Sequence, residues 1–427
     1  FFTNMPTNGG MVQYQAQLNE KNTDMSQFAG GLVTDANGKA TVAALRDKLI
    51  GMGYPEDITP EKGTVPSSIC GVDRSFKMPQ VWKTSFAIDY NLPTSFPMSV
   101  TAEYIYNKTV NAAILKDWAV PSMAGFPRLN GADNRALFPA GFQTMKSAYV
   151  LENTSKGYGW SASLTLNARP IETLSLMASY THSMAKEMTS LPGSNASSVL
   201  NYVTTVEGPN NMHLHNAENI TPDRFILSAT HHDKHGNHVS IIYEAYRGGY
   251  NYSYAMVNDM NGDGYNYDAL YIPTDEQVKN GEFRFKTQDD ADRFMAFVHK
   301  DDYLSSHQGE YAESYSVYNP WVHRVDLGYK HDFSLKLGKT KHTLQLSCDI
   351  KNVLNMFNSS WGVAKIMNTD FQDSGIGRIL KYEGVDAQGY GVYSTPASIN
   401  RDTKTWIKNH AIGQCWYASV GIKYIFN

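Results

Sequence analysis

The sequence contains no run of about 18 consecutive apolar residues, which excludes a membrane-spanning helix. Charged residues make up only 18% of the 427 residues, and the net charge of −4 comes without any Lys/Arg run. We therefore expect no nucleic-acid partner. No GxSxG, HExxH or P-loop motif is present, and Gly375-Ile376-Gly377-Arg378 lacks the strand–turn–helix context of a nucleotide site. We expect no enzymatic activity.

Cysteine is also scarce. Cys70, Cys348 and Cys415 lie far apart and form no CxxC pair. This spacing argues against a thiolate metal site, and we expect small packed hydrophobic side chains rather than a disulfide. No signal peptide precedes the opening Phe1-Phe2, so we expect a mature protein or a piece of a longer one.

Aromatic residues, by contrast, are abundant. They make up 12% of the chain and include 27 Tyr. Rings with a polar tip sit well where a strand passes from lipid into water. This composition suits strands that have one face in a membrane.

Segments of alternating apolar and polar residues are joined by connections that are in turn very short and very long. The short connections are Pro93–Pro97, Arg169–Thr173, Asp233–Asn237 and Leu335–Thr340. The long connections are about 121–146, 190–222, 256–319 and 356–414. Periplasmic turns and extracellular loops alternate in this way in an outer-membrane β-barrel, with antiparallel strands between them.

The last segment, 415–427, shows the alternation most clearly. Its apolar face carries Trp416, Ala418, Val420, Ile422, Tyr424 and Phe426. Its other face carries Tyr417, Ser419, Gly421, Lys423 and Asn427. Eight earlier segments follow the same period of two, near 79–92, 100–107, 160–167, 174–181, 223–232, 238–254, 324–333 and 342–351.

A soluble β-sandwich also alternates, but its connections are mostly short, and loops beyond about 15 residues are uncommon in compact domains. Nine strands with alternating directions begin and end in the same direction, so the first and the last cannot pair antiparallel. An open edge in lipid leaves backbone groups unpaired at several kcal/mol each, so we expect further strands upstream. We predict an all-β fold: the C-terminal portion of a larger transmembrane antiparallel β-barrel with long extracellular loops.

We divide the chain into two parts. Residues 1–76 form an extracellular loop region, and residues 77–427 form the C-terminal strands of the barrel with their long outer loops. Within the first part, Asn37-Gly38-Lys39 precedes apolar residues at helical spacing up to Met52. This predicts a short surface helix that ends before Gly53.

One segment of the third long loop has the spacing of a calcium loop. Oxygen-bearing side chains stand at positions 1, 3 and 5, Gly264 at position 6 permits a sharp turn, and a backbone carbonyl serves at position 7. Leu270 occupies the twelfth position, where a helix–loop–helix site needs Glu. The predicted ligands of a structural Ca²⁺ are Asp259, Asn261, Asp263, Tyr265 and Asp268. The alternative is an Asp-Gly turn without metal.

Two other clusters have simpler interpretations. Four histidines crowd one tight turn, where neighbouring side chains point to opposite faces, so we expect a solvated turn rather than a zinc site. They are His231, His232, His235 and His238. A tyrosine-rich stretch from Tyr246 to Tyr271 predicts either an outer aromatic girdle or a surface on which a ligand stacks.

Five motifs in order resemble the Oar-like TonB-dependent receptors of Bacteroidetes. They are Phe76–Trp82, Asn258–Asp263 with Asp268–Pro273, Tyr303–Glu310, Asp349–Asn355 with Trp361-Gly362, and Gly421–Asn427. The resemblance covers about 76–427. It implies a 22-stranded outer-membrane barrel that is plugged by an N-terminal domain and energised through TonB. The plug and the TonB box of such receptors do not lie within these residues.

The resemblance favours a TonB-dependent importer of a solute or peptide. Its partners would be outer-membrane lipid, the remaining strands and plug, and TonB. The alternative is a non-transporting barrel, derived from a receptor, that holds surface or periplasmic proteins as a structural or assembly-complex subunit. A secreted β-rich adhesin is a third class. In the first two cases we expect the protein in the outer membrane of a Gram-negative bacterium.

Overall fold

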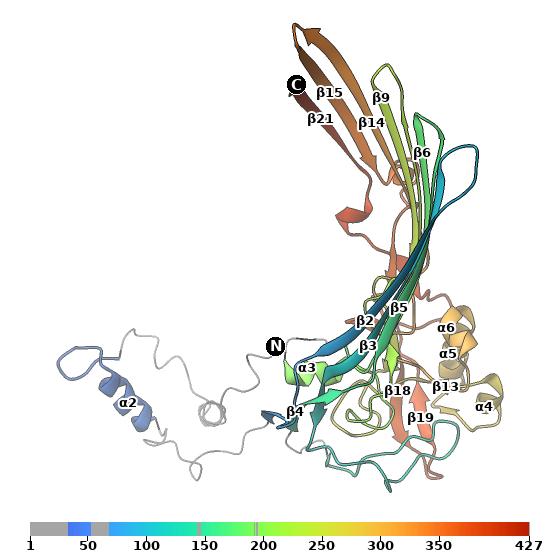
Figure 1. Cartoon of the computed structure of the whole chain (residues 1–427). Coiled ribbons are helices and arrows are strands. Elements are labelled where there is room, and N and C mark those ends of the chain that lie inside the picture. Colours follow the sequence, from blue (N-terminus) through green and yellow to red (C-terminus); the bar gives the residue numbers. More distant parts are fainter. Residues whose placement is uncertain (1–32, 53–67, 143–146, 192, 194, 427) are drawn as a thin grey trace.

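The computed structural model describes residues 33–52, 68–142, 147–191, 193 and 195–426. A tall, twisted sheet rises from a compact group of loops (Figure 1). The chain ends in the last strand of that sheet.

Nine strands are paired antiparallel, each with its neighbour, in the order β2-β3-β5-β6-β8-β9-β14-β15-β21. Their positions match the nine alternating segments, which confirms this part of the prediction. Their bounds are β2 (Gln80–Asn91), β3 (Met98–Asp117), β5 (Tyr158–Ile171), β6 (Leu174–Glu187), β8 (Asp223–His232), β9 (Asn237–Arg247), β14 (Val322–Leu337), β15 (Thr340–Lys351) and β21 (Tyr417–Phe426).

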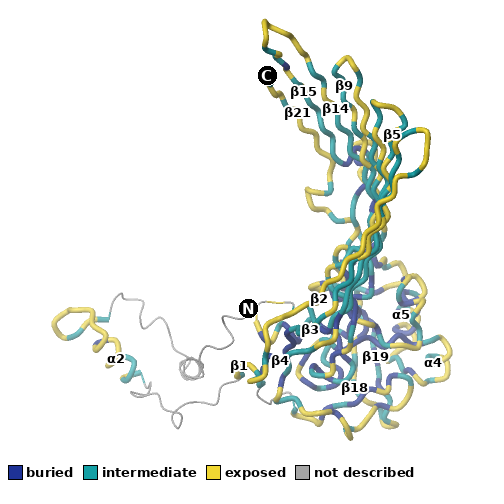
Figure 2. The backbone as a smooth tube through the Cα atoms, in the orientation of Figure 1, coloured by how far each residue is buried: buried dark blue, intermediate teal, exposed yellow. Residues whose placement is uncertain are grey.

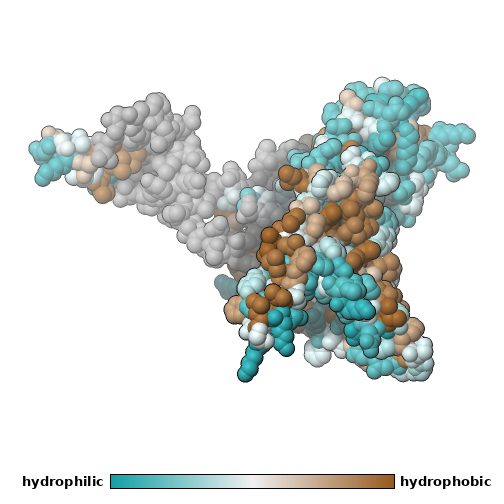
Figure 3. Space-filling model, turned by 90° about the horizontal axis from the view of Figure 1, so that it is seen from above, coloured by the Kyte–Doolittle hydropathy of each residue, from teal (hydrophilic) through white to brown (hydrophobic). Residues whose placement is uncertain are grey.

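One face of this sheet is apolar and open. Trp82 and Phe86 on β2 are 67% and 63% exposed, and Val420 and Ile422 on β21 are 80% and 73% exposed. Seen from above, hydrophobic residues gather along the strands (Figure 3). A continuous exposed apolar face of this size is typical of strands that meet lipid. The opposite face carries ion pairs such as Arg224–Glu244, as expected for a wet lumen.

Short turns lie at one end of the sheet and long loops at the other, as predicted. The turns connect β2 to β3, β5 to β6, β8 to β9 and β14 to β15. The four long loops, which we call L1 to L4, follow β3, β6, β9 and β15. L1 spans 118–157, L2 spans 188–222, L3 spans 248–321 and L4 spans 352–416.

The two outermost strands have no partner along one edge within the described residues. β2 pairs only with β3, and β21 pairs only with β15. Because eight antiparallel pairings separate them, β2 and β21 run in the same direction. They cannot close the sheet against each other as antiparallel neighbours, as the sequence predicts.

β3 continues well past the apolar band. Its 20 residues span roughly 65 Å at about 3.3 Å per residue, whereas an outer-membrane apolar band is about 25 Å tall. Beyond Asn111 it pairs with β4 (Ser147–Thr154), and β4 pairs in parallel with β1 (Ser68–Val72). This extension carries the sheet into the loop region.

The predicted helix is present as α2 (Val42–Gly51), and its N-cap Thr41 accepts a hydrogen bond from the Ala44 backbone N–H. Most of the remaining elements belong to the long loops. They are α3 (Ala196–Asn201), β7 (His215–Asn216), β10 (Ser253–Met256), β11 (Tyr271–Ile272), α4 (Asp275–Lys279), β12 (Arg284–Phe285), α5 (Gln288–Lys300), α6 (Asp302–Ser306), β13 (Glu310–Tyr311), α7 (Val353–Phe357), β16 (Lys365–Met367), β17 (Gln372–Asp373), β18 (Ile376–Val385), β19 (Gly391–Ser394), β20 (Trp406–Lys408) and η3 (Ile412–Gln414).

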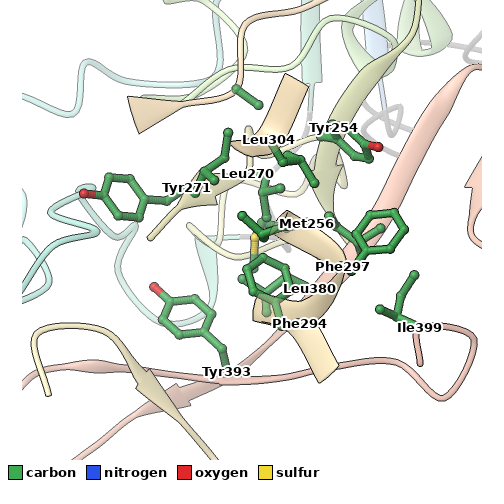
Figure 4. Packing of buried hydrophobic residues seen from close by; sticks show 14 of the residues in the cluster. Tyr254, Met256, Leu270, Tyr271, Phe294, Phe297, Leu304, Leu380, Tyr393 and Ile399 are labelled. Atoms are coloured by element: carbon green, nitrogen blue, oxygen red, sulfur yellow. The ribbon is translucent and has the colours of Figure 1, made fainter. Parts of the chain in front are cut away.

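The main hydrophobic core lies in the loops, not in the sheet (Figure 2). L3 and L4 contribute most of it, including Phe294 and Phe297 of α5 and Leu380 of β18 (Figure 4). Phe294 and Phe297 are three residues apart on α5, so they lie on one helix face and are buried together. The long loops therefore form a folded unit, which alternation in the strands did not predict.

The three cysteines are free, as expected, but the expected packing is wrong for two of them. Cys70 and Cys415 are exposed, because one lies on the edge strand β1 and the other precedes β21. Cys348 is half-buried on the apolar face of β15.

Among the helices that the structure describes, none is long and apolar enough to cross a membrane.

Replacing Phe294, which is fully buried, by Ala tests whether the loops fold as a unit. We expect a loss of about 3–5 kcal/mol from that unit, because the cavity left behind cannot collapse fully. Proteolysis of L3 and L4 in the purified protein should accelerate, while the heat-modifiable migration of the barrel on gels stays unchanged. Ile412→Ala, at a position that is 91% exposed, is the control and should behave as wild type. Equal proteolysis of both variants would contradict a folded loop core.

A loop junction with a candidate metal site

The predicted calcium segment forms a tight turn held by its own side chains. The two carboxylate oxygens of Asp259 accept hydrogen bonds from the backbone N–H groups of Gly262 (2.7 Å) and Gly264 (2.9 Å). Asn261 Oδ1 accepts one from the N–H of Asp263 (2.9 Å). Asp263 Oδ1 accepts one from the N–H of Tyr265 (2.7 Å). Gly262 and Gly264 have φ angles of +82° and +90°, which glycine adopts without strain.

This segment of L3 touches the neighbouring loops and the end of β3. The Tyr265 hydroxyl donates to Asp117 Oδ2 at the end of β3 (2.8 Å). The Asn261 carbonyl accepts from the Phe138 N–H of L1 (2.6 Å). Two further backbone bonds join Thr205 of L2 to Tyr267 and Ala269 of L3.

L4 reaches the same segment through one side chain. Arg378 Nη1 donates to the carbonyl oxygens of Val257 (3.1 Å) and Asn266 (3.0 Å). All four long loops therefore meet around residues 257–269. We call this region the loop junction.

A buried ion network lies beside the turn. Arg135 of L1 makes a two-pronged pair with Asp133, with Nε–Oδ1 at 2.9 Å and Nη2–Oδ2 at 3.0 Å. Its Nη2 also donates to the Ala269 carbonyl (2.8 Å). Arg135 Nη1 lies 3.6 Å from Asp268 Oδ1, and neither of these two buried atoms has a hydrogen-bond partner in the described structure.

Asp133 connects this network to L3 and L4. Its two carboxylate oxygens accept hydrogen bonds from the hydroxyls of Tyr311 and Tyr393, both at 2.9 Å. Asp133 and Arg135 carried no signal in the sequence, because two charges in a polar loop look like a solvated surface. Only the packing of three loops around them shows their role.

The acidic residues at the junction are buried close together, which disfavours their ionised forms. Burial, together with the nearby Asp268 carboxylate, raises the pKa of Asp263 to about 8. Burial raises the pKa of Asp268 to about 7 even though Arg135 opposes the shift. Burial also raises the pKa of Asp259. A cation at this position would relieve the repulsion between the three carboxylates.

The predicted ligands do not converge as a ready metal site. In the part of the chain that the structure describes, no group of three or more His, Cys, Asp or Glu side chains is arranged to hold a metal ion. Asp268 Oδ2 accepts from the Met260 N–H (2.7 Å), and the other side-chain oxygens accept from the turn itself. The metal assignment therefore stays a prediction.

In the histidine turn, His231, His232 and His235 are exposed, as expected for a solvated turn. His232 and His238 stack at 6.2 Å between ring centres, and His238 lies 3.3 Å from Asp332 on the next strand. From Tyr252 onward, the tyrosine-rich stretch differs from the girdle interpretation, which applied to its first few residues. Tyr252, Tyr254 and Tyr271 are buried in the loop core, because L3 folds back on itself instead of leaving the membrane as an open strand.

The raised pKa values predict how stability depends on pH. The ordinary pKa of Asp is 3.8, whereas Asp263 and Asp268 have values of about 8 and about 7 in the folded protein. A folded form that binds protons more tightly than the unfolded form loses stability as pH rises through that window. With chelator present, thermal unfolding of the loop unit should therefore shift to lower temperature between about pH 4 and pH 8.

Asp263→Asn removes one of these carboxyls and should flatten the pH dependence. Asp402→Asn, at an exposed position of L4, should leave it as in wild type. The measurement is tryptophan fluorescence during heating in detergent at several pH values. If the unfolding temperature of Asp263→Asn falls with pH as steeply as that of wild type, the Asp263 carboxyl is ionised in the folded state over the whole pH range.

The chain is similar to a known protein family and to a solved structure. The family model described as outer membrane beta barrel domain matches residues 3–384. No curated protein matches the chain. A solved structure that does match is the outer membrane transporter YddB from Escherichia coli, at 10% sequence identity and a TM-score of 0.36. The match covers 84% of this chain and 35% of that one, so the chain spans about a third of the transporter's length.

The family match covers most of the chain, including eight of the nine paired strands. It agrees with the exposed apolar face, the antiparallel pairing and the alternation of short turns with long loops. The protein is located in the outer membrane. The chain belongs to the outer membrane beta barrel domain family.

Proposed function

We propose that this protein is part of an outer-membrane receptor that imports a solute or peptide with energy from TonB. The observation that carries the proposal is the combination of a barrel-family sheet with long loops folded into a unit at one end. Such a unit over the barrel mouth is suited to capture a ligand before passage. The TonB dependence rests on the resemblance to Oar-like receptors.

The open sheet supports completion of the barrel by further strands. The free edges of β2 and β21 would each leave backbone N–H and C=O groups unpaired in hydrocarbon, at several kcal/mol per group. Both edges need neighbours that run in the opposite direction. The resemblance implies a barrel of 22 strands. Because that number is even, every strand, including β2 and β21, has antiparallel neighbours on both sides.

A non-transporting barrel is the second candidate. The observation that favours it is the rigidity that the buried Arg135–Asp133 pair and the junction give to the loops, since a rigid outer unit suits a docking platform. In that case the loops would hold partner proteins stably and no solute would cross.

Deletion of the gene, compared with deletion of tonB, tests transport. Cells are grown in a complex medium, and the solutes that remain are compared by mass spectrometry. We expect at least one class of solute to remain in the medium of both deletion strains and to be consumed by the parent. Consumption in the gene deletion equal to the parent, together with a stable protein complex on purification, would favour the second candidate instead.

We also propose a structural Ca²⁺ in the Asp259–Asp268 segment. The order of its oxygen-bearing residues and the burial of three neighbouring carboxyl groups, whose ionised forms need a compensating charge, support this assignment. Bound Ca²⁺ would replace the protons that Asp263 and Asp268 otherwise retain near neutral pH.

The metal content of the purified protein tests this proposal. We expect close to one Ca²⁺ per chain after dialysis against micromolar Ca²⁺, and loss of most of it in Asp263→Ala. Asp402→Ala removes an exposed carboxylate in a different loop, L4. It is the matched control and should retain the ion. Equal Ca²⁺ content in Asp263→Ala and wild type would exclude this site.

A further inference from the structure

A cavity of about 600 Å³ lies between L3 and the outer ends of β9 and β14, away from the loop junction. Its walls come from α6, from the residues that lead into β14, and from β20 of L4. In Figure 1, α5 and α6 lie beside the loop ends of the strands. Neither the metal assignment nor the transport proposal makes use of this cavity.

Aromatic rings from three different segments line the cavity. Tyr303 of α6 is stacked on His307 at 4.2 Å between ring centres, so one of its faces is already covered. Trp406 of β20 is held edge-on by Tyr252 at 5.6 Å. Trp321, which directly precedes β14, is 44% exposed. His323 stacks against one side of its ring, at 6.3 Å between ring centres, and leaves the other side for a ligand.

Some polar groups of the cavity are already engaged by the protein. The Asp301 carboxylate accepts from the Tyr254 hydroxyl (2.8 Å), the Thr405 hydroxyl (2.6 Å) and the Leu304 N–H (2.8 Å). Glu313 pairs with Lys186 of β6 at 2.5 Å. These two carboxylates shape the cavity and have little capacity left for a ligand.

Two opposite charges are left for a ligand. The exposed Asp302 carboxylate has no hydrogen-bond or ion-pair partner among the residues that the structure describes. The Arg247 guanidinium lies over the Tyr318 ring at 5.3 Å. Arg247 stands opposite Asp223 in the β8–β9 pairing, but the two form no ion pair within the described ranges, so the guanidinium can still donate to a ligand. Tyr303 accepts from the Glu313 N–H (2.9 Å), so its own hydroxyl proton is free to donate. The cavity thus presents donors and an acceptor side by side with flat rings.

The position of the cavity relative to the membrane follows from strand phase. Arg247 lies on the same face of β9 as Val239 and Ile241, which belong to the apolar outward row. Side chains alternate between the two faces of a strand, and Trp321 lies four residues before Val325 and six before Leu327. Trp321 therefore continues the outward row of these two residues. The cavity therefore opens on the outer side of the barrel wall, just beyond the residues that face lipid.

From this arrangement we propose that the cavity binds a saccharide. A pyranose ring offers C–H groups to an aromatic face, and its neighbouring hydroxyls both donate and accept hydrogen bonds. Trp321 would stack on the ring, while Asp302 and Arg247 would hold adjacent hydroxyls. The saccharide is either a free oligosaccharide or the sugar portion of a surface glycolipid, because the cavity lies at the level where such sugars stand.

A peptide fits the same walls less well. Extended peptides gain most of their affinity from a free strand edge or from apolar pockets for alternate side chains. β9 and β14, whose outer ends border the cavity, are paired with each other, so no ladder is open to a peptide here. The inference goes beyond the proposed function, because binding at this cavity on the outer side of the barrel wall does not require import.

Binding to the purified full-length protein in detergent tests the inference without any need for transport. The probes are maltohexaose, chitohexaose and xylohexaose for the free source, the delipidated core oligosaccharide of the host's lipopolysaccharide for the glycolipid source, and mixed tetrapeptides. We expect quenching of tryptophan fluorescence by at least one saccharide. Trp321→Ala and Asp302→Asn should each weaken its binding at least tenfold.

Trp361→Ala removes an equally exposed tryptophan of L4 that does not line the cavity, and should bind as wild type. Heat-modifiable migration confirms that each variant is folded. Binding of a free hexasaccharide or of the core oligosaccharide supports the inference and identifies the source. The inference would be overturned if only tetrapeptides bound or if no saccharide bound. It would also be overturned if Trp321→Ala and Asp302→Asn bound the saccharide as tightly as wild type. If saccharide binds but uptake is independent of TonB, the transport proposal fails and this site stands.

Discussion

The whole structure depends on one requirement: a backbone polar group in hydrocarbon must have a partner within the protein. Nine strands meet this requirement by antiparallel pairing with their neighbours, and each pairing places one apolar row outside and one polar row inside. The same requirement makes the two free edges informative. An edge that is harmless in water is costly in lipid, so β2 and β21 point to strands beyond this sheet.

Outside the membrane the balance of forces changes, and the loops fold as a soluble protein does. Phe294, Phe297 and Leu380 are buried because water, not lipid, surrounds the loop unit. A buried charge is tolerated there only when it is paired, and the Arg135 guanidinium meets Asp133 and the Ala269 carbonyl. The pairing fixes L1 against L3, and through Tyr393 against L4.

The packing of the loops against one another has a functional consequence. A ligand site assembled from several loops keeps its shape only if the loops are fixed relative to one another. Trp321, Asp302 and Trp406 come from separate segments, and the shared core of L3 and L4 holds them around one cavity.

The sequence by itself determined the sheet: the strands, their faces, the short turns and the shared direction of the first and last strands. It could do so because a strand with one face in lipid must alternate with a period of two, and that period is visible in residues such as Val420 and Ile422. It also identified the Asp259–Asp268 turn, since turn chemistry is local. Only the tertiary structure decided that the loops fold together, that Arg135 is buried beside Asp268, and that Trp321 and Asp302 share a cavity. These contacts join residues of different loops, and no local pattern records which distant residue a loop side chain will meet.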